Sequence, residues 1–158
     1  MTDYERLLRT LDRAGVQLIV IGGFAATLHG SARLTEDLDV VYARTPQNIE
    51  RLVTALAPLR PYLRGAPPGL PFLWDAATIL RGLNFTLTTD SGDFDLLGEI
   101  AGGGTYDDLL PESSTVQIFG IECPVLGLRR LIQAKRAAGR PKDFDAVAEL
   151  ERILEEQE

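Results

Sequence analysis

The chain has 158 residues, a length that suits one domain with a sizeable apolar core. Hydrophobic residues make up 45% of the chain and charged residues 25%, a composition that excludes a disordered protein. The formal net charge of −7 argues against non-specific binding of duplex nucleic acid, because such binding depends on neutralising phosphates.

The cysteine content and the first residues indicate a reducing, cytoplasmic setting. Cys123 is the only cysteine, so no disulfide can form within the chain. The start of the chain has no export signal, and no apolar run approaches the roughly 20 residues that cross a bilayer. We therefore expect a single domain over residues 1–158, without a membrane segment.

The first half of the chain is predicted to alternate helices with buried strands. It opens on an amphipathic pattern, and a β-branched apolar run then precedes Gly22 and Gly23. Thr45 and Pro46 are residue types that begin helices. The expected elements are a helix at 4–11, a strand at 17–21, a short helix at 24–29, a strand at 37–42 and a helix from 46.

The second half predicts two hairpins followed by two helices. The segment 60–71 holds four prolines and two glycines, so we expect a loop there. Strand-like runs at 83–88 and 93–97 flank a turn, and a second hairpin is expected around Gly120. From about residue 127 the chain is expected to be helical. The fold class is therefore α/β or α+β, with a mixed β-sheet and flanking helices.

Two carboxylates, Asp37 and Asp39, lie two residues apart on a predicted strand and so share one face of it. Like charges held together repel each other, and a divalent cation such as Mg²⁺ relieves this repulsion with carboxylate oxygens as ligands. A third carboxylate would complete such a site. Asp95 is the preferred candidate and Asp93 its competitor, since Asp93 lies beside a turn. The alternative is a pair of acidic residues on a solvated strand face.

Gly22 and Gly23 lie between an apolar strand and a helix start, where backbone amides could cradle a phosphate. A tight strand-to-helix turn explains the pair equally well. Arg33 could bind a phosphate or neutralise the nearby aspartates. His29 is expected to have a structural role in preference to that of a catalytic base.

Lys135 falls within the apolar stripe of a predicted helix, at the spacing set by Leu128, Leu131 and Ile132. An ammonium group in such a position needs water or a negatively charged partner. We expect it to point into an acidic, phosphate-binding cleft. The alternative is a frayed helix end that leaves the ammonium in water.

Three separate motifs together resemble the nucleotidyltransferase (polymerase-β-like) superfamily. They are Ile21-Gly22-Gly23, Asp37-Leu38-Asp39-Val40 and Phe94-Asp95-Leu96. The stretch 29–39 and the tail segments 131–135 and 139–143 are similar to a small bacterial and archaeal group within it. That group includes minimal nucleotidyltransferases and abortive-infection toxins.

The resemblance implies transfer of a nucleoside monophosphate from a nucleoside triphosphate to an acceptor. It implies that Asp37, Asp39 and Asp95 are the catalytic residues and ligate Mg²⁺ or Mn²⁺, with Asp95 also as the base. Gly22, Gly23 and Lys135 would bind the nucleotide. Arg33, which could bind a phosphate, is a fourth candidate for nucleotide binding. Many members have Gly-Ser where this chain has Gly22-Gly23, so a serine hydroxyl contact to phosphate is missing.

The hypothesis is therefore a metal-dependent nucleotidyltransferase whose acceptor is RNA, protein or a small molecule. One alternative is a component of a toxin–antitoxin pair that acts mainly through protein–protein interaction. Another is a catalytically weak nucleotide-binding domain. Because the chain shows no second domain to hold a large acceptor, a toxin or antitoxin partner or a homodimer could supply that surface.

Overall fold

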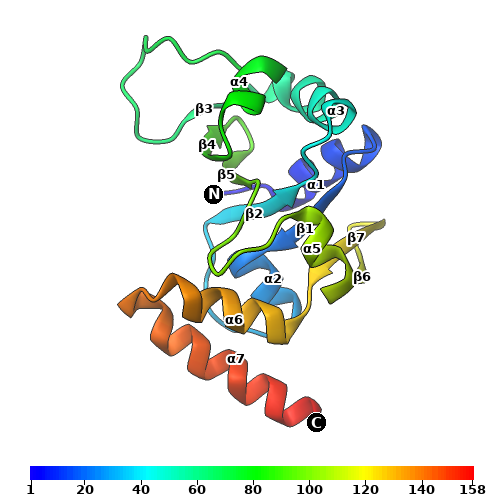
Figure 1. Ribbon diagram of the computed structural model, residues 1–158, viewed down its shortest axis with the longest axis vertical. Coiled ribbons are helices and arrows are strands. Elements are labelled where there is room, and N and C mark those ends of the chain that lie inside the picture. Colours follow the sequence, from blue (N-terminus) through cyan, green and yellow to red (C-terminus); the bar gives the residue numbers. More distant parts are fainter.

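Seven strands form one mixed sheet in the computed structural model, which describes residues 1–158 (Figure 1). The strands are β1 (Leu18–Ile21), β2 (Asp37–Tyr42), β3 (Tyr62–Leu63), β4 (Asn84–Thr89), β5 (Gly92–Leu97), β6 (Ser113–Ile118) and β7 (Ile121–Leu126). The helices are α1 (Tyr4–Arg13), α2 (Gly22–Leu28), α3 (Pro46–Leu56), α4 (Ala76–Arg81), α5 (Tyr106–Leu109), α6 (Leu128–Ala138) and α7 (Phe144–Gln157). The predicted fold class, a mixed sheet with flanking helices, is confirmed.

The order of the strands across the sheet is β3-β4-β5-β2-β1-β7-β6. At its centre, β2 pairs in parallel with β5 and antiparallel with β1, and β1 pairs in parallel with β7. The hairpins β4–β5 and β6–β7 are antiparallel. The two acidic segments of the sequence therefore lie on neighbouring strands, although they are far apart along the chain.

Helices cover the sheet and extend the molecule in two directions (Figure 1). In this view α3 and α4 form the upper part, while α6 and α7 pack against each other in the lower part. One apolar core joins residues of the strands to Leu7, Leu8 and Leu11 of α1. Tyr4 of α1 stacks on Phe24 of α2, with ring centroids 4.3 Å apart. None of the helices combines the length and apolarity that crossing a membrane requires.

The loop prediction for 60–71 was wrong at β3. Tyr62 and Leu63 pair with Thr88 and Leu87 at the edge of the sheet. Nearby prolines are compatible with an edge strand because its outer side needs no hydrogen bond from a neighbouring strand. Helix α4 was also not predicted, although Asp75 begins it as an N-cap and accepts a hydrogen bond from the Thr78 amide.

Asn48 joins three segments of the core through its buried side chain. Its Oδ1 accepts a hydrogen bond of 2.6 Å from the Gln17 amide. Its Nδ2 donates to the carbonyls of Gln17 and Ala43, at 3.0 and 2.8 Å. Because the residue is 1% exposed, water cannot replace these partners. The side chain therefore fixes the start of α3 against one end of the β1–β2 pair, where β1 begins and β2 ends.

We predict that Asn48→Ala lowers the free energy of unfolding by about 2 kcal/mol or more, because it leaves buried backbone groups without partners. Urea unfolding followed by circular dichroism measures the change. The exposed neighbour Gln47 provides the control, and Gln47→Ala should shift stability by no more than about 0.5 kcal/mol. Equal losses in the two variants would contradict the role given to Asn48.

Candidate functional site

The register between β2 and β5 brings four aspartates together. Asp37 lies beside Asp93, and Asp39 lies beside Asp95. Paired residues on neighbouring strands point to the same face, and so do residues two apart on one strand. The intervening residue Leu38 is fully buried on the opposite face. All four carboxylates therefore project from one face of the sheet.

Three of these carboxylates are close enough to share a cation. Asp37, Asp39 and Asp95 each offer an oxygen, and the three oxygens lie within 4.8 Å of one another. Asp93 is outside this group. The Oδ1 atom of Asp39 is buried and has no hydrogen-bond partner. Hard carboxylate oxygens are the ligands that Mg²⁺ and Mn²⁺ take, so this set of residues can hold a divalent cation.

The electrostatics of the cluster also favour an added positive charge. Burial raises the pKa of Asp39 to about 8, and the charges of Asp37 and Asp95 contribute to the rise. Burial and the neighbouring Asp95 raise the pKa of Asp37, while Arg64 acts in the opposite direction. Without a cation, the cluster therefore favours at least one protonated carboxyl group.

Arg64, which directly follows β3, is the residue of this site that sequence reasoning missed. Its Nη2 lies 2.7 Å from Asp95 Oδ1, and its Nη1 lies 3.5 Å from Asp37 Oδ2. Its Nε lies 3.4 Å from Asp93 Oδ2. The segment was expected to be a loop, so nothing in the local pattern pointed this arginine at the acidic cluster.

The glycine turn is required by the packing of the carboxylates. Gly22 has φ +68°, and a Cβ at this position would overlap the carboxylate of Asp39. A Cβ on Gly23 would lie 2.6 Å from Thr35 Oγ1. Neither position can hold a larger residue without displacing a neighbour. The absence of a side chain at Gly22 therefore lets the carboxylate of Asp39 lie directly against the strand-to-helix turn.

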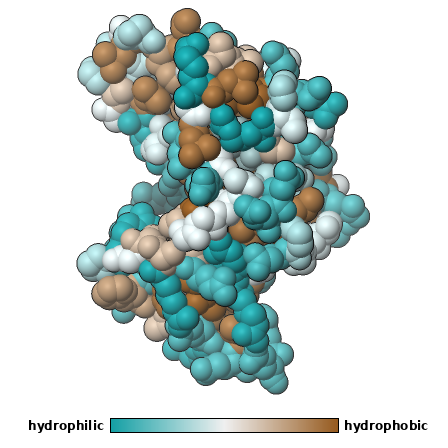
Figure 2. All heavy atoms as spheres, in the orientation of Figure 1, coloured by the Kyte–Doolittle hydropathy of each residue, from teal (hydrophilic) through white to brown (hydrophobic).

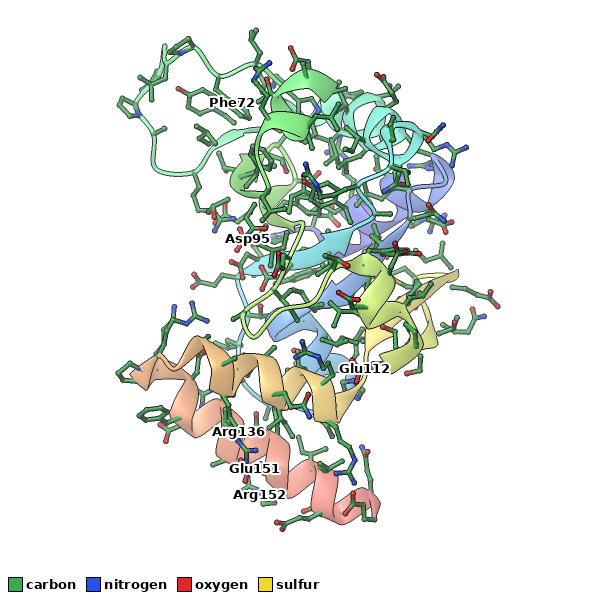
Figure 3. All side chains as sticks on the ribbon, in the orientation of Figure 1. Phe72, Asp95, Glu112, Arg136, Glu151 and Arg152 are labelled. Atoms are coloured by element: carbon green, nitrogen blue, oxygen red, sulfur yellow. The ribbon has the colours of Figure 1, made fainter.

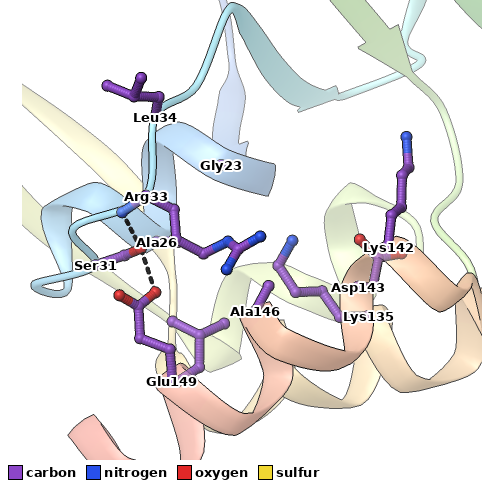
Figure 4. A pocket seen from close by; sticks show the side chains of 11 residues that line it. Gly23, Ala26, Ser31, Arg33, Leu34, Lys135, Lys142, Asp143, Ala146 and Glu149 are labelled. Atoms are coloured by element: carbon purple, nitrogen blue, oxygen red, sulfur yellow. Dashed lines mark hydrogen bonds between the residues drawn. The ribbon is translucent and has the colours of Figure 1, made fainter.

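Two cavities of about 240 Å³ each share Gly23 and Lys135 in their linings, and one of them reaches the cluster. Gly22 and Asp39 line the cavity nearer the carboxylates. The other cavity is lined by Arg33 and Lys142, and Figure 4 shows Arg33 and Lys135 pointing toward each other in it. Cationic side chains therefore lie next to the acidic cluster.

The remaining predicted residues have distinct positions. Helix α6 continues past Lys135 to Ala138, so this lysine is not at a frayed end. Its charge lowers the pKa of Asp39, as expected for an ammonium facing that carboxylate. Arg33 forms no ion pair with Asp37 or Asp39, whereas Arg64 pairs with Asp37 and with Asp95. His29 Nε2 lies 2.8 Å from the Leu126 carbonyl, which gives it a structural partner.

The molecule is narrow near the level of Asp95. The space-filling view narrows to a waist between the upper part and the α6–α7 part (Figure 2). Asp95 lies at this waist (Figure 3). In the order of the strands, β1, which leads into Gly22, lies on one flank of the carboxylates, and β4 and β3 lie on the other. The carboxylates thus lie between β1 on one side and the β4–β3 edge of the sheet on the other.

We predict that Gly22→Ala destabilises the fold and weakens Mn²⁺ binding, because the new methyl group displaces Asp39. Gly15→Ala is the matched control, since Gly15 has φ +71° and a methyl group there would meet no atom within 4 Å. Both variants incur the left-handed backbone cost of about 1–2 kcal/mol. Urea unfolding and calorimetric titration with Mn²⁺ should show a larger stability loss, and a loss of affinity, only for Gly22→Ala. Identical behaviour would contradict the packing argument.

We also predict that the metal-free protein loses stability as pH rises from about 5 to 8. The pKa of Asp39 lies near 8 in the folded protein, against 3.8 for an ordinary aspartate. Over this interval the folded protein holds a proton that the unfolded chain has released, so unfolding releases a proton and higher pH favours it. Urea unfolding in EDTA should show a flatter pH dependence for Asp39→Asn. Parallel curves would contradict the assignment.

Comparison with known proteins places this geometry in a known architecture. No family profile and no curated protein sequence matches the chain. Among solved structures, a Thermotoga maritima protein suggested to be a nucleotidyltransferase superposes with a TM-score of 0.59, at 18% identity over 94% of each chain. The lincosamide antibiotic adenylyltransferase LnuA, solved with lincomycin bound, gives 0.62 at 14% identity, over 96% of this chain and 98% of LnuA. The chain therefore has the nucleotidyltransferase fold.

Proposed function

We propose that the protein is a metal-dependent nucleotidyltransferase that moves a nucleoside monophosphate from a nucleoside triphosphate to an acceptor. The observation that carries the proposal is the three-carboxylate cluster of Asp37, Asp39 and Asp95, beside a cavity that Asp39 and Lys135 both line. A nucleotide with its metal needs this combination, since carboxylates hold the cation and cationic side chains hold the phosphates.

The nucleotide is assigned to the flank formed by β1 and α6. There Gly22 and Gly23 leave space beside Asp39, and Lys135 faces the same space. In the adjoining cavity Arg33 supplies a further positive charge for the distal phosphates. The missing serine hydroxyl of the Gly-Ser motif leaves phosphate binding to backbone amides and these cations.

The acceptor is assigned to the opposite flank, where β5 meets β4 and β3. Asp95 lies on this side of the cluster, since β5 separates β2 from β4. The proposal therefore gives its carboxylate the role of taking the proton from an acceptor hydroxyl. The acceptor oxygen would bond to the α-phosphorus as the bond from that phosphorus to the β-phosphate oxygen breaks, and pyrophosphate leaves. Bound Mg²⁺ or Mn²⁺ would polarise the phosphate oxygens and offset their charge.

The acceptor class is a separate part of the proposal. LnuA acts on lincosamide antibiotics, and its structure holds lincomycin, so a hydroxylated small molecule is one candidate. RNA and protein are the others. Partnership with a toxin or antitoxin, and formation of a homodimer, stay predictions from the sequence.

The test is transfer of label from α-³²P nucleoside triphosphates in Mg²⁺ or Mn²⁺, with cellular RNA, cellular protein and lincomycin as separate acceptors. Asp37→Asn and Asp39→Asn should abolish transfer, since each removes a cation ligand. Asp95→Asn should lower the rate by about 10²-fold or more, because it removes the base as well as a ligand. Asp93→Asn, on the same strand, leaves the three proposed cation ligands in place and should lower the rate by less than Asp95→Asn does.

Equal losses for Asp93→Asn and Asp95→Asn would contradict the assignment of Asp95. Two results together would contradict both the proposed enzymatic activity and the proposed metal site. They are the absence of transfer to every acceptor and unchanged nucleotide binding in Asp37→Asn. Nucleotide binding that needs Asp37 but leads to no transfer would favour the catalytically weak nucleotide-binding domain instead.

A further inference from the structure

The guanidinium of Arg64 lies among the same carboxylates that are proposed to ligate the cation. It reaches Asp95 at 2.7 Å, Asp93 at 3.4 Å and Asp37 at 3.5 Å. These contacts cross three strands of the sheet, because Arg64 follows β3 while the aspartates belong to β5 and β2. A single side chain therefore supplies positive charge to most of the cluster.

The backbone and the Nη2 atom of Arg64 are both held by hydrogen bonds, whereas its Nε atom has none. Its amide donates to the Thr86 carbonyl at 3.0 Å, which extends the pairing of β3 with β4 by one residue. Its Nη2 donates to the Leu87 carbonyl at 2.7 Å. Its Nε is buried without a hydrogen bond, and the side chain as a whole is 27% exposed. The guanidinium is therefore anchored near the cluster with incomplete hydrogen bonding there.

We propose that Arg64 is an internal counterion that holds the carboxylate cluster together without metal and competes with the divalent cation for Asp37 and Asp95. The inference rests on the metal site of the proposed function. Two positive charges cannot occupy the same small group of oxygens without strong repulsion. Binding of the cation therefore requires Arg64 to withdraw from at least Asp95.

Asp93 is the carboxylate with which the displaced guanidinium of Arg64 can stay paired. It lies outside the group of three carboxylates, yet its Oδ2 is already 3.4 Å from Arg64 Nε. Its side chain is also the most exposed of the three that Arg64 contacts, at 39% against 33% for Asp37 and 20% for Asp95. A small shift toward Asp93 would free the deeper oxygens while keeping the charge of Arg64 paired.

The experiment is titration of the full-length protein with Mn²⁺ in the absence of nucleotide. The concentration of free Mn²⁺ is measured at each step by electron paramagnetic resonance. Arg64→Gln should bind Mn²⁺ about tenfold more tightly, as expected for loss of a competing charged contact. In EDTA the same variant should melt at a lower temperature than the unmodified protein, because the carboxylates lose their counterion. Mn²⁺ should raise its melting temperature by a larger interval.

Arg60→Gln is the matched control. Arg60 precedes the same segment and pairs with Asp90, but its side chain is 81% exposed and contacts none of the cluster. It changes the net charge by the same amount, so it measures the general electrostatic effect, which should be less than about twofold in Mn²⁺ affinity. Tightening in Arg64→Gln and not in Arg60→Gln supports competition within the site.

Unchanged or weaker Mn²⁺ binding in Arg64→Gln would overturn the inference. If this variant does not fold, Arg64→Met replaces it, since methionine removes the charge but keeps a long apolar stem. Arg64→Met should also bind Mn²⁺ more tightly than the unmodified protein, and equal or weaker binding would overturn the inference. Absence of Mn²⁺ binding in every protein would overturn the proposed metal site itself, whereas binding without an Arg64 effect would overturn only the competition.

Discussion

Repulsion among carboxylates placed side by side by the β2–β5 pairing is the constraint on which the rest of the site depends. The register sets Asp37 beside Asp93 and Asp39 beside Asp95, and no rotation of a side chain can move them to the other face. The neighbouring residues reduce the steric crowding and the repulsion among these carboxylates. Gly22 leaves room for Asp39, Arg64 supplies a counterion, and Lys135 adds a cation on the opposite flank.

The parts of the site that sequence reasoning could predict are those written in local periodicity. Asp37 and Asp39 share a face because side chains in a strand alternate with a period of two residues. Lys135 is recognisable as a charged residue within an apolar stripe because helices repeat every 3.6 residues. Arg64 has no such local signal. Its role depends on a two-residue edge strand among prolines, whose pairing with β4 is decided by residues more than twenty positions away. Helix α4 was missed for a simpler reason, since it is only six residues long.

The structural comparisons show how little of this arrangement needs a particular sequence. Both solved structures share the fold over more than nine tenths of this chain, at identities of 18% and 14%. The fold can therefore persist while most side chains change. In this chain the carboxylates are surrounded by a glycine that leaves room for Asp39 and by an arginine that reaches in from the edge of the sheet.

The order of the strands also has a consequence for how the protein folds. The β4–β5 and β6–β7 hairpins join neighbouring segments, so each closes only a short loop of chain. The parallel pairing of β2 with β5 must close a loop that contains α3, β3, α4 and β4. Non-local pairings of this kind are slow because loop entropy is lost before contacts are gained. We therefore expect the aspartates of the two strands to come together after the hairpins have formed, as the central sheet closes.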